Sequence, residues 1–405
     1  MLFKLAYRNI WRNKRRTLIT AASIMFAVFF ATIMKSIQKA AWGNMLDNIL
    51  KYHIGYAQIQ DKTYVKTMSI DEAFLMNDTL DALPSKVDGV SGLVPRLQSF
   101  ALASNENNTK GTLVIGVDPE KENEFTGLKD RVSKGSYFNK NEPAVLVAEG
   151  LAEYLKLEIG DTLILISQGY HATNSAGKYA VKGFVYFASP ELNDQMLYLP
   201  LEQAQYFYGA EGRLSALVVL TDKPKNIKKQ VKALQANLDG TNFKVQDYEE
   251  LLPALLQAKS FDAAGGTVVL SILYIIIGFG IFGTLLMMIK EREYEFGILK
   301  AIGMNSAKLN WMLWIETMVL GMIGCIAGAL LSLPLILYLQ YHPIKFTGDY
   351  AAAYEKFGIE PIFPAALDWS IILNQSLIVF LMITIMSLYP LLKIMKLNPV
   401  KAMRG

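Results

Sequence analysis

Four long apolar segments constrain this chain more than any other feature. The hydrocarbon core of a bilayer is about 30 Å thick, so a helix that crosses it needs about 20 mostly apolar residues. Soluble core helices rarely carry so long a run without charged residues, and only Glu316 interrupts the four segments. We therefore predict four transmembrane helices, at Thr17–Met34, Ala263–Ile289, Leu309–Leu339 and Trp369–Leu392.

The first segment could instead be a secretory signal peptide. Its positively charged region is long, however, and Met34-Lys35-Ser36-Ile37 does not fit a small-x-small cleavage site. We therefore predict an uncleaved signal anchor whose helix continues outward through Gln38 and Trp42.

Lysine and arginine residues near the ends of the segments predict the orientation, because short cytoplasmic loops are enriched in them. The loop between the third and fourth segments holds two lysines, offset by four acidic residues. We therefore expect both termini in the cytoplasm, with residues from about 40 to 260 and the loop 341–368 outside. The cytoplasmic residues are Lys4, Arg8, Arg12, Lys14, Arg15, Arg16, Lys290, Arg292, Lys300, Lys308, Lys393, Lys396, Lys401 and Arg404.

Composition excludes several classes of function. The net charge is +4 and no basic stripe alternates with aromatic residues, so nucleic-acid binding is not expected. The single cysteine, Cys325, cannot form a disulfide within the chain or a cysteine-based metal site. The three histidines lie far apart, so we predict no metal site.

Residues 43–262 are predicted to form a large mixed α/β domain, because short alternating runs intervene between helical patterns. The predicted strands are Tyr56–Gln60, Thr112–Val117, Ala144–Val147, Thr162–Ile166, Val181–Phe187, Met196–Leu199 and Ala216–Leu220. The predicted helices are Glu149–Leu155, Leu201–Tyr208 and Lys225–Leu238.

This domain carries no recognisable catalytic motif. The nearest approach to a phosphate-binding loop, Ala176-Gly177-Lys178-Tyr179, lacks the first glycine and the hydroxyl residue that holds Mg²⁺. We therefore predict a non-catalytic subunit with no cofactor of its own.

The link between the second and third predicted spans, residues 290–308, has an amphipathic pattern. Phe296, Leu299 and Ile302 recur at i, i+3 and i+6, and Gly303 suits the end of a helix. Such a helix could dock a partner protein, or it could be a loop on the membrane surface; the pattern alone leaves both open.

Two features of the third span also allow two interpretations. Glu316 could have a functional role, either through a contact with arginines of the N-terminal segment or in coupling to a partner. Alternatively, its carboxylate could simply reach the membrane interface. Gly324-x-x-x-Gly328 permits close packing of helices, although small residues are common in spans.

Several motifs resemble those of the MacB, LolC/LolE and FtsX group of ABC-transporter permeases, which is also called the mechanotransmission or type VII family. The four main motifs occur in the order found in that family. The strongest match is Glu291–Gly303, which resembles the coupling segment of the family. Looser matches occur outside the spans. The matching residues are Ala6–Thr17, Glu291–Gly303, Glu316 with Gly321, Gly324 and Gly328, Tyr389-Pro390, Leu397–Arg404, Gly55–Ile59, Gly160-Asp161-Thr162 and Tyr198–Leu201.

The resemblance implies a domain order: an N-terminal helix and first span over 1–42, a periplasmic domain over 43–262, and an FtsX-like domain over 263–405. The periplasmic domain would comprise a porter-like part, about 52–115 and 213–250, and an inserted distal part, about 116–212. The implied site residues are Glu291, Arg292, Glu295, Phe296, Gly297, Leu299, Lys300, Ala301, Ile302 and Gly303 for ATPase coupling, Arg8, Trp11, Arg12, Arg15 and Arg16 in the N-terminal helix, and Glu316, Gly321, Gly324 and Gly328 for helix packing.

The resemblance also implies partners. These are separate ATPase chains that bind ATP and Mg²⁺, a second permease, identical or a sister subunit, membrane lipids, and a lipoprotein substrate with a periplasmic carrier or adaptor. The expected location is the bacterial inner membrane, and the expected function is release or export of lipoproteins. Export of a periplasmic solute or peptide, as in MacB, and regulation of a cell-wall hydrolase, as in FtsX, are the alternatives.

Overall fold

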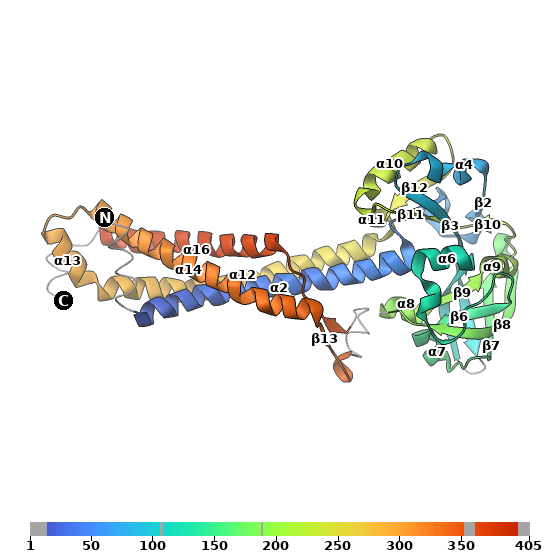
Figure 1. Cartoon of the computed structure of the whole chain (residues 1–405), viewed down its shortest axis with the longest axis horizontal. Helices are drawn as coiled ribbons and strands as arrows, with labels where there is room; N and C mark the ends of the chain where they lie inside the picture. The colour runs from blue at the N-terminus through green and yellow to red at the C-terminus, as the bar shows by residue number, and fades with distance from the viewer. Residues whose placement is uncertain (1–13, 106–107, 188, 352–360, 396–405) are drawn as a thin grey trace. The chain divides into compact units, whose positions relative to one another are not determined.

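The computed structural model describes residues 14–105, 108–187, 189–351 and 361–395 (Figure 1). The chain divides into two compact units, which are described separately. The membrane unit comprises Met1–Trp42, Ala258–Lys345 and Ile362–Gly405. The inserted unit comprises Gly43–Gln257 and Phe346–Pro361.

Four long helices carry the predicted spans: α2 (Lys14–Ile49), α12 (Pro253–Glu291), α14 (Ser306–Tyr341) and α16 (Trp369–Met395). Each is long and apolar enough to cross a membrane, which confirms the predicted fold class. At a rise of 1.5 Å per residue, α12 is about 58 Å long, nearly twice the hydrocarbon thickness. The predicted continuation of the first helix through Gln38 and Trp42 is also confirmed.

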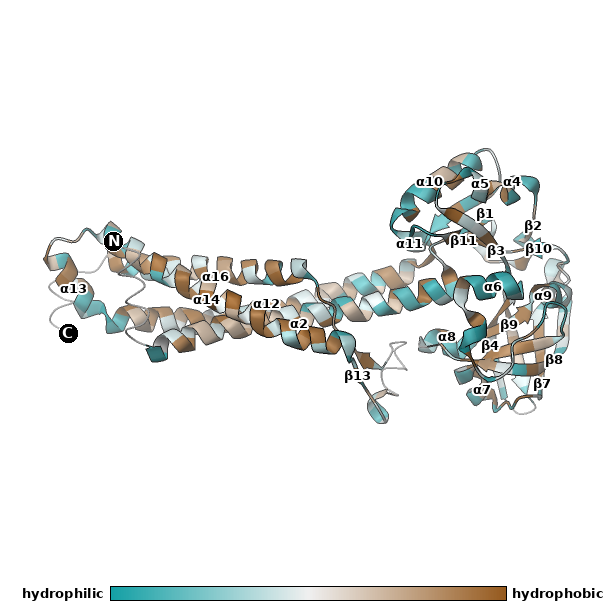
Figure 2. Ribbon diagram, in the orientation of Figure 1, coloured by the Kyte–Doolittle hydropathy of each residue, from teal (hydrophilic) through white to brown (hydrophobic). Residues whose placement is uncertain are grey.

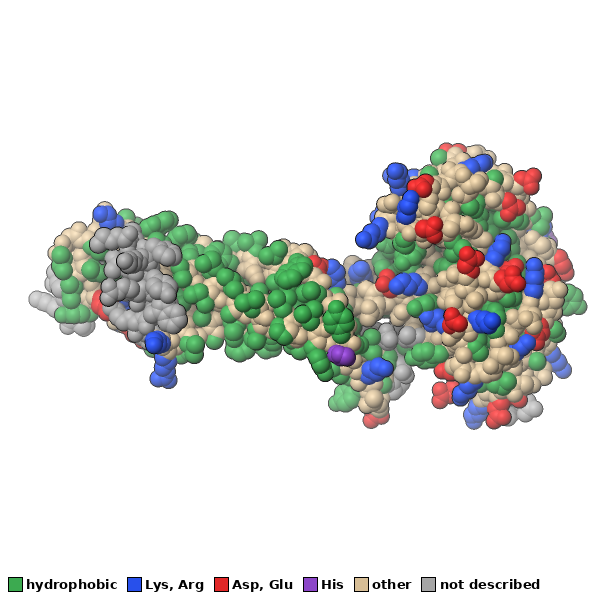
Figure 3. Space-filling view, in the orientation of Figure 1, with side chains coloured by type: hydrophobic (Ala, Val, Ile, Leu, Met, Phe, Trp, Pro, Cys, Tyr) green, Lys and Arg blue, Asp and Glu red, His purple; other side chains and the backbone are tan. Residues whose placement is uncertain are grey.

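The outer surface of these helices is apolar, as the brown ribbons of Figure 2 and the green side chains of Figure 3 show. Large apolar residues are strongly exposed there, among them Phe279 at 70%, Leu373 at 67% and Ile385 at 67%. A bilayer solvates such side chains, whereas the backbone polar groups are satisfied within each helix.

Contacts among the helices are made by a separate set of buried side chains. Ile24 and Val28 of α2 pack with Ile281 and Leu285 of α12 and with Val379 of α16, all in one apolar cluster. At the far ends of α2 and α12, Asp262 accepts hydrogen bonds from Gln38 Nε2 at 2.8 Å and Trp42 Nε1 at 2.7 Å. Polar contacts therefore join α2 and α12 beyond the apolar cluster.

The inserted unit is built on one ten-stranded mixed sheet. Neighbouring strands are antiparallel except for the pairs β4–β9 and β6–β8. The sheet order is β12 (Phe243–Asp247), β1 (Ala57–Asp61), β11 (Ala216–Thr221), β3 (Val90–Asn105), β4 (Asn108–Val117), β9 (Met196–Pro200), β6 (Ala144–Ala148), β8 (Asn174–Val185) and β5 (Val132–Gly135), with β7 (Thr162–Gln168) pairing β3 and β8.

Short helices and strands complete the two units. The helices are α3 (Tyr64–Thr67), α4 (Asp78–Asp81), α5 (Leu83–Lys86), α6 (Pro119–Thr126), α7 (Glu149–Leu155), α8 (Pro190–Gln195), α9 (Leu201–Tyr208), α10 (Ile227–Asn237), α11 (Tyr248–Leu251) and α13 (Glu293–Ala301). The small strand pairs are β2 (Phe74–Leu75) with β10 (Arg213–Leu214), and β13 (Ile344–Lys345) with β14 (Ile362–Phe363).

The inserted unit has two hydrophobic cores. One core takes Ala57, Ile59, most buried apolar residues from Phe74 to Leu93, and those from Leu214 to Val245. Residues such as Leu97, Val114 and Ile115 belong to the other core. The division of the unit near residue 115 stays a prediction. Because β3 runs unbroken through both cores, no turn in the sequence marks the boundary.

A buried ion pair lies where these two cores meet. Arg96 and Glu122 have fully buried side chains, joined by Nε–Oε2 at 2.9 Å and Nη2–Oε1 at 2.6 Å. Arg96 Nη1 also donates to the carbonyl oxygen of His53. Burial, followed by the charge of Glu122, raises the pKa of Tyr137 and Tyr198. This pair holds β3, α6 and the helical turn Leu50–Ile54 together.

Candidate functional site

The short helix expected between the second and third spans is α13. α12 ends at Glu291 and α13 begins at Glu293, because Arg292 leaves the helical conformation at φ −105° and ψ 7°. The break turns the Arg292 side chain into the helical bundle, where it is 7% exposed.

Arg292 is the centre of a buried polar cluster. Its Nη1 donates to Glu316 Oε2 of α14 at 2.9 Å, and its Nε donates to Glu295 Oε2 at 3.2 Å. The guanidinium carbon also lies 5.0 Å from the ring centroid of Phe296. These contacts tie α12, α13 and α14 at one point.

Glu316 therefore contacts the coupling segment directly. Its side chain is 1% exposed, because it is covered by the surrounding helices and paired with Arg292. The other predicted contact of Glu316, with arginines of the N-terminal helix, stays a prediction. Arg8, Trp11, Arg12 and the side chain of Arg16 lie outside the described residues. Arg15 is exposed at the start of α2.

The two faces of α13 differ in burial. Phe296 is fully buried in the helical cluster, Gly297 is buried and Leu299 is partly buried against the same cluster. Ile302 is 79% exposed and does not share that face, because it follows the last helical residue. Tyr294 is 58% exposed.

Gly303 ends the segment as predicted, with φ +98°. Its N–H donates to the Lys300 carbonyl at 3.1 Å, and the N–H of Met304 donates to the Leu299 carbonyl at 2.9 Å. This is the Schellman arrangement, in which glycine is preferred at the left-handed position. Lys300 Nζ donates in turn to the Met395 carbonyl at 3.3 Å, and Ala301 is exposed.

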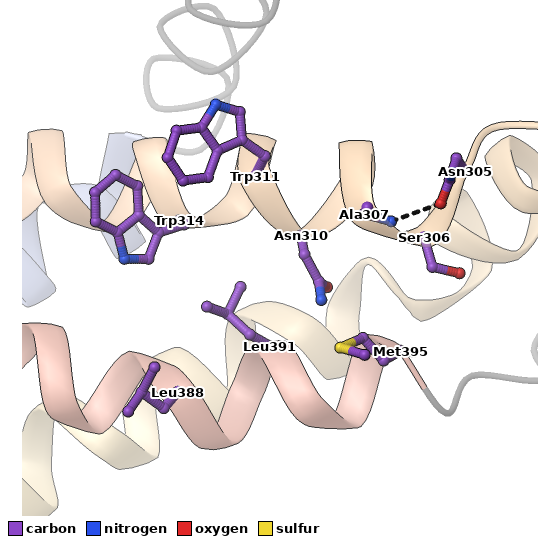
Figure 4. Close-up of a pocket in the computed structure, with 9 residues that line it drawn as sticks. All are labelled: Asn305, Ser306, Ala307, Asn310, Trp311, Trp314, Leu388, Leu391 and Met395. Atoms are coloured by element: carbon purple, nitrogen blue, oxygen red, sulfur yellow. Dashed lines mark hydrogen bonds between the residues drawn. The ribbon is translucent and has the colours of Figure 1, made fainter.

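A pocket of about 550 Å³ opens between α14 and α16 (Figure 4). Trp311 and Trp314 stack along its wall with ring centroids 4.8 Å apart. Asn305 Oδ1 accepts from the Ala307 N–H at 2.9 Å and caps α14. The sequence prediction missed this pocket, although Trp-x-x-Trp at i and i+3 indicated a shared helix face.

The small residues of α14 pack against two different helices. A Cβ atom at Gly324 would lie 2.5 Å from Ile24 of α2, and one at Gly328 would lie 2.5 Å from the Met25 carbonyl oxygen. Gly321 faces Ile383 of α16 at 3.4 Å, an ordinary contact. The backbones of α14 and α2 can therefore approach closely only where glycine is present.

We expect Gly328→Ala to destabilise the helical bundle by about 1–3 kcal/mol, because the added methyl group overpacks a backbone contact. Thermal unfolding in detergent measures the change. Gly280→Ala is the matched control, since nothing lies within 4 Å of a Cβ at that position in α12. Equal midpoints for the two variants would contradict this account of the packing.

No group of three or more His, Cys, Asp or Glu side chains that could hold a metal ion occurs in the described part of the chain. The features brought together at this site are instead a buried ion pair, an exposed short helix and an aromatic pocket.

Comparison with known families agrees with this architecture. Residues 17–237, more than half of the chain, match the MacB-like periplasmic core domain. Residues 267–399 match the FtsX-like permease C-terminal domain, which includes the coupling segment. The chain belongs to the MacB/FtsX permease family. It is a transmembrane permease subunit of an ABC transporter.

Among curated relatives, the lipoprotein-releasing system transmembrane protein LolC of Neisseria meningitidis serogroup B is 19% identical over 77% of this chain and 75% of its own length. LolE of Haemophilus influenzae is 23% identical over 78% of this chain and 77% of its own. The periplasmic region of MacB from Actinobacillus actinomycetemcomitans is 14% identical, with a TM-score of 0.36, over 52% of this chain and 97% of its own.

Proposed function

We propose that this permease transmits the ATP-driven motion of a separate ATPase chain to its inserted unit. In this proposal both termini and α13 lie in the cytoplasm of a bacterium, and the inserted unit lies in the periplasm. ATP and Mg²⁺ bind to the ATPase, and the permease works as a dimer with an identical or sister subunit.

The observation that carries this proposal is the Arg292–Glu316 pair. A force applied to the exposed side of α13 passes through a buried, charge-assisted contact into α14 and, through the helix break, into α12. The first residues of α12 belong to the inserted unit, so the chain connects the two without a linker. Such a rigid connection suits a lever, whereas a loop that only avoids the bilayer needs no buried ion pair.

The substrate that we propose is a lipoprotein, released or exported from the inner membrane. The names of the LolC and LolE relatives describe lipoprotein release. This chain matches about three quarters of the length of each of them. A periplasmic carrier or adaptor would receive the lipoprotein. Neither export of a solute nor regulation of a cell-wall hydrolase has comparable support.

A pull-down of the tagged chain in mild detergent tests the docking surface. We expect a P-loop ATPase to be retained by the native chain, and Ile302→Asp to reduce its retention roughly tenfold, because a charge replaces an exposed apolar contact. Ile344→Asp is the matched control, since Ile344 is also exposed, at 52%, but lies in strand β13, which follows α14.

Retention of the ATPase by the Ile302 variant at the native level would exclude the C-terminal end of α13 as part of its docking site. Absence of any ATPase from the native pull-down, with ATP present, would contradict the proposed assembly itself. Identification of a lipoprotein in the same preparation would support the substrate.

A further inference from the structure

A second pocket, of about 370 Å³, lies within the inserted unit. Its floor carries three glutamine side chains that are more than nine-tenths buried: Gln58, Gln60 and Gln246. Gln58 and Gln246 are directly opposite each other in the antiparallel pair β1–β12, so their side chains share one face. Buried amides on one face are unusual unless something satisfies them.

Two buried polar atoms of this pocket have no hydrogen-bond partner among the described residues. His53 is 8% exposed and its Nδ1 makes no hydrogen bond there; the same holds for Nε2 of Gln98. Gln58 donates to the Ile54 carbonyl at 2.7 Å and accepts from Gln60 Nε2 at 3.3 Å, so these two glutamines are partnered within the unit. An unsatisfied buried donor or acceptor costs about 1–3 kcal/mol, so Nδ1 of His53 and Nε2 of Gln98 point to a ligand that pairs with them.

The rim of the pocket is apolar. Met68 is 72% exposed and Phe100 is 64% exposed, and both line the opening. Met68 adopts a left-handed backbone conformation, φ 49°, which is strained for a residue with a side chain. From Phe100 the apolar surface continues over Leu102, which pairs with Ile166 of β7; these two are about half exposed.

The charge of the lining limits the ligand. Glu250 is the acidic side chain among the lining residues, and it pairs with Lys244. The other polar lining side chains are the His53 imidazole, the hydroxyls of Tyr64 and Ser99, and four glutamine amides, which both donate and accept hydrogen bonds. A polypeptide backbone offers the matching alternation of N–H and C=O groups. An acyl chain could cover the rim but could not satisfy the floor.

We propose that this pocket binds an extended, uncharged polypeptide segment that carries an apolar side chain. The glutamine amides and His53 pair with the backbone of the segment, and its apolar side chain lies against Met68 and Phe100. The inference rests on the proposed function only in taking the exported substrate to be a polypeptide. Among the pocket residues, His53 lies in the helical turn that directly follows α2, and Pro253 is the first residue of α12.

Calorimetric titration of the full chain in lipid nanodiscs tests this site. The probe is the terminally blocked hexapeptide acetyl-Ser-Gly-Leu-Asn-Ser-Gly-amide, and we expect saturable binding. Gln246→Ala and Phe100→Ser should each weaken it at least tenfold. Tyr206→Ser is the control, since Tyr206 is 76% exposed on α9 and does not line the pocket; its affinity should equal that of the native chain.

Replacing the leucine of the probe with aspartate should also weaken binding at least tenfold. Absence of saturable binding, or equal affinity in all variants, would overturn the proposal. Displacement of the peptide by short-chain phosphatidylcholine would assign the pocket to a lipid instead. Because the pocket variants leave α13 intact, ATPase retention in the pull-down stays a separate measure of the proposed function.

Discussion

Arg292→Leu is expected to destabilise the helical bundle by about 3–5 kcal/mol, because it leaves the carboxylate of Glu316 buried beside an apolar side chain. The variant should also lose most of the ATPase retained in a pull-down, since α13 is no longer held against α14. Thermal unfolding in detergent and the pull-down measure the two effects.

The double variant Arg292→Leu with Glu316→Leu provides the decisive comparison. Replacing both members of a buried pair with apolar residues is often neutral for stability or stabilising. We therefore expect the double variant to recover most of the lost stability but not the ATPase, if the pair positions α13. If the double variant recovers both its stability and the ATPase, the ion pair only packs the helices and does not position α13.

Lys290→Ala serves as a control for loss of a nearby charge. Lys290 Nζ and Glu293 Oε2 lie 2.8 Å apart, but the lysine is 74% exposed. Exposed pairs contribute about 0–1 kcal/mol, so its unfolding midpoint should stay close to that of the native chain. A loss equal to that of Arg292→Leu would mean that burial of the Arg292 pair is not the cause.

Arg96→Met should destabilise the inserted unit by about 3–5 kcal/mol, through the uncompensated charge of Glu122 and the loss of the contact to the His53 carbonyl. Limited proteolysis of the full chain at increasing urea concentrations measures this effect. Cleavage between the two cores should occur at lower urea than in the native chain.

The control for this variant is Lys223→Ala. Lys223 and Asp88 form an ion pair at 2.9 Å in the same unit, but both side chains are at least half exposed. Its loss should change stability by no more than about 1 kcal/mol. If Arg96→Met and Lys223→Ala are cleaved at the same urea concentration, the buried pair does not join the two cores.

Predictions from local pattern succeeded where one segment contained all the information. α7 and α9 begin and end at the predicted residues, and the strand β6 lies within one residue of its prediction. The pattern predicts no strand over Val90–Asn105, although the structure contains one. Gly92 and Pro95 weaken the strand signal there, and pairing with β11 and β4 on either side overrides it.

Contacts between distant residues were the limit of prediction at the candidate site. The sequence placed Arg292, Phe296 and Gly303 in one segment, but the partners it offered for Glu316 were the N-terminal arginines and not Arg292. The two charges lie 24 residues apart, and several other cations could have approached the same carboxylate. Only the helix break at Arg292, which depends on packing against α14, selects one of them.

By itself, the sequence determined the four spans, since a long uncharged run in a bilayer must form a helix that satisfies its own backbone. It also determined the helix stop at Gly303, where a positive φ favours glycine. Only the tertiary structure decided the Arg292–Glu316 and Arg96–Glu122 pairs, the boundary of the two cores and the glutamine-lined pocket. Each of these depends on side chains that are far apart along the chain and are brought together by packing.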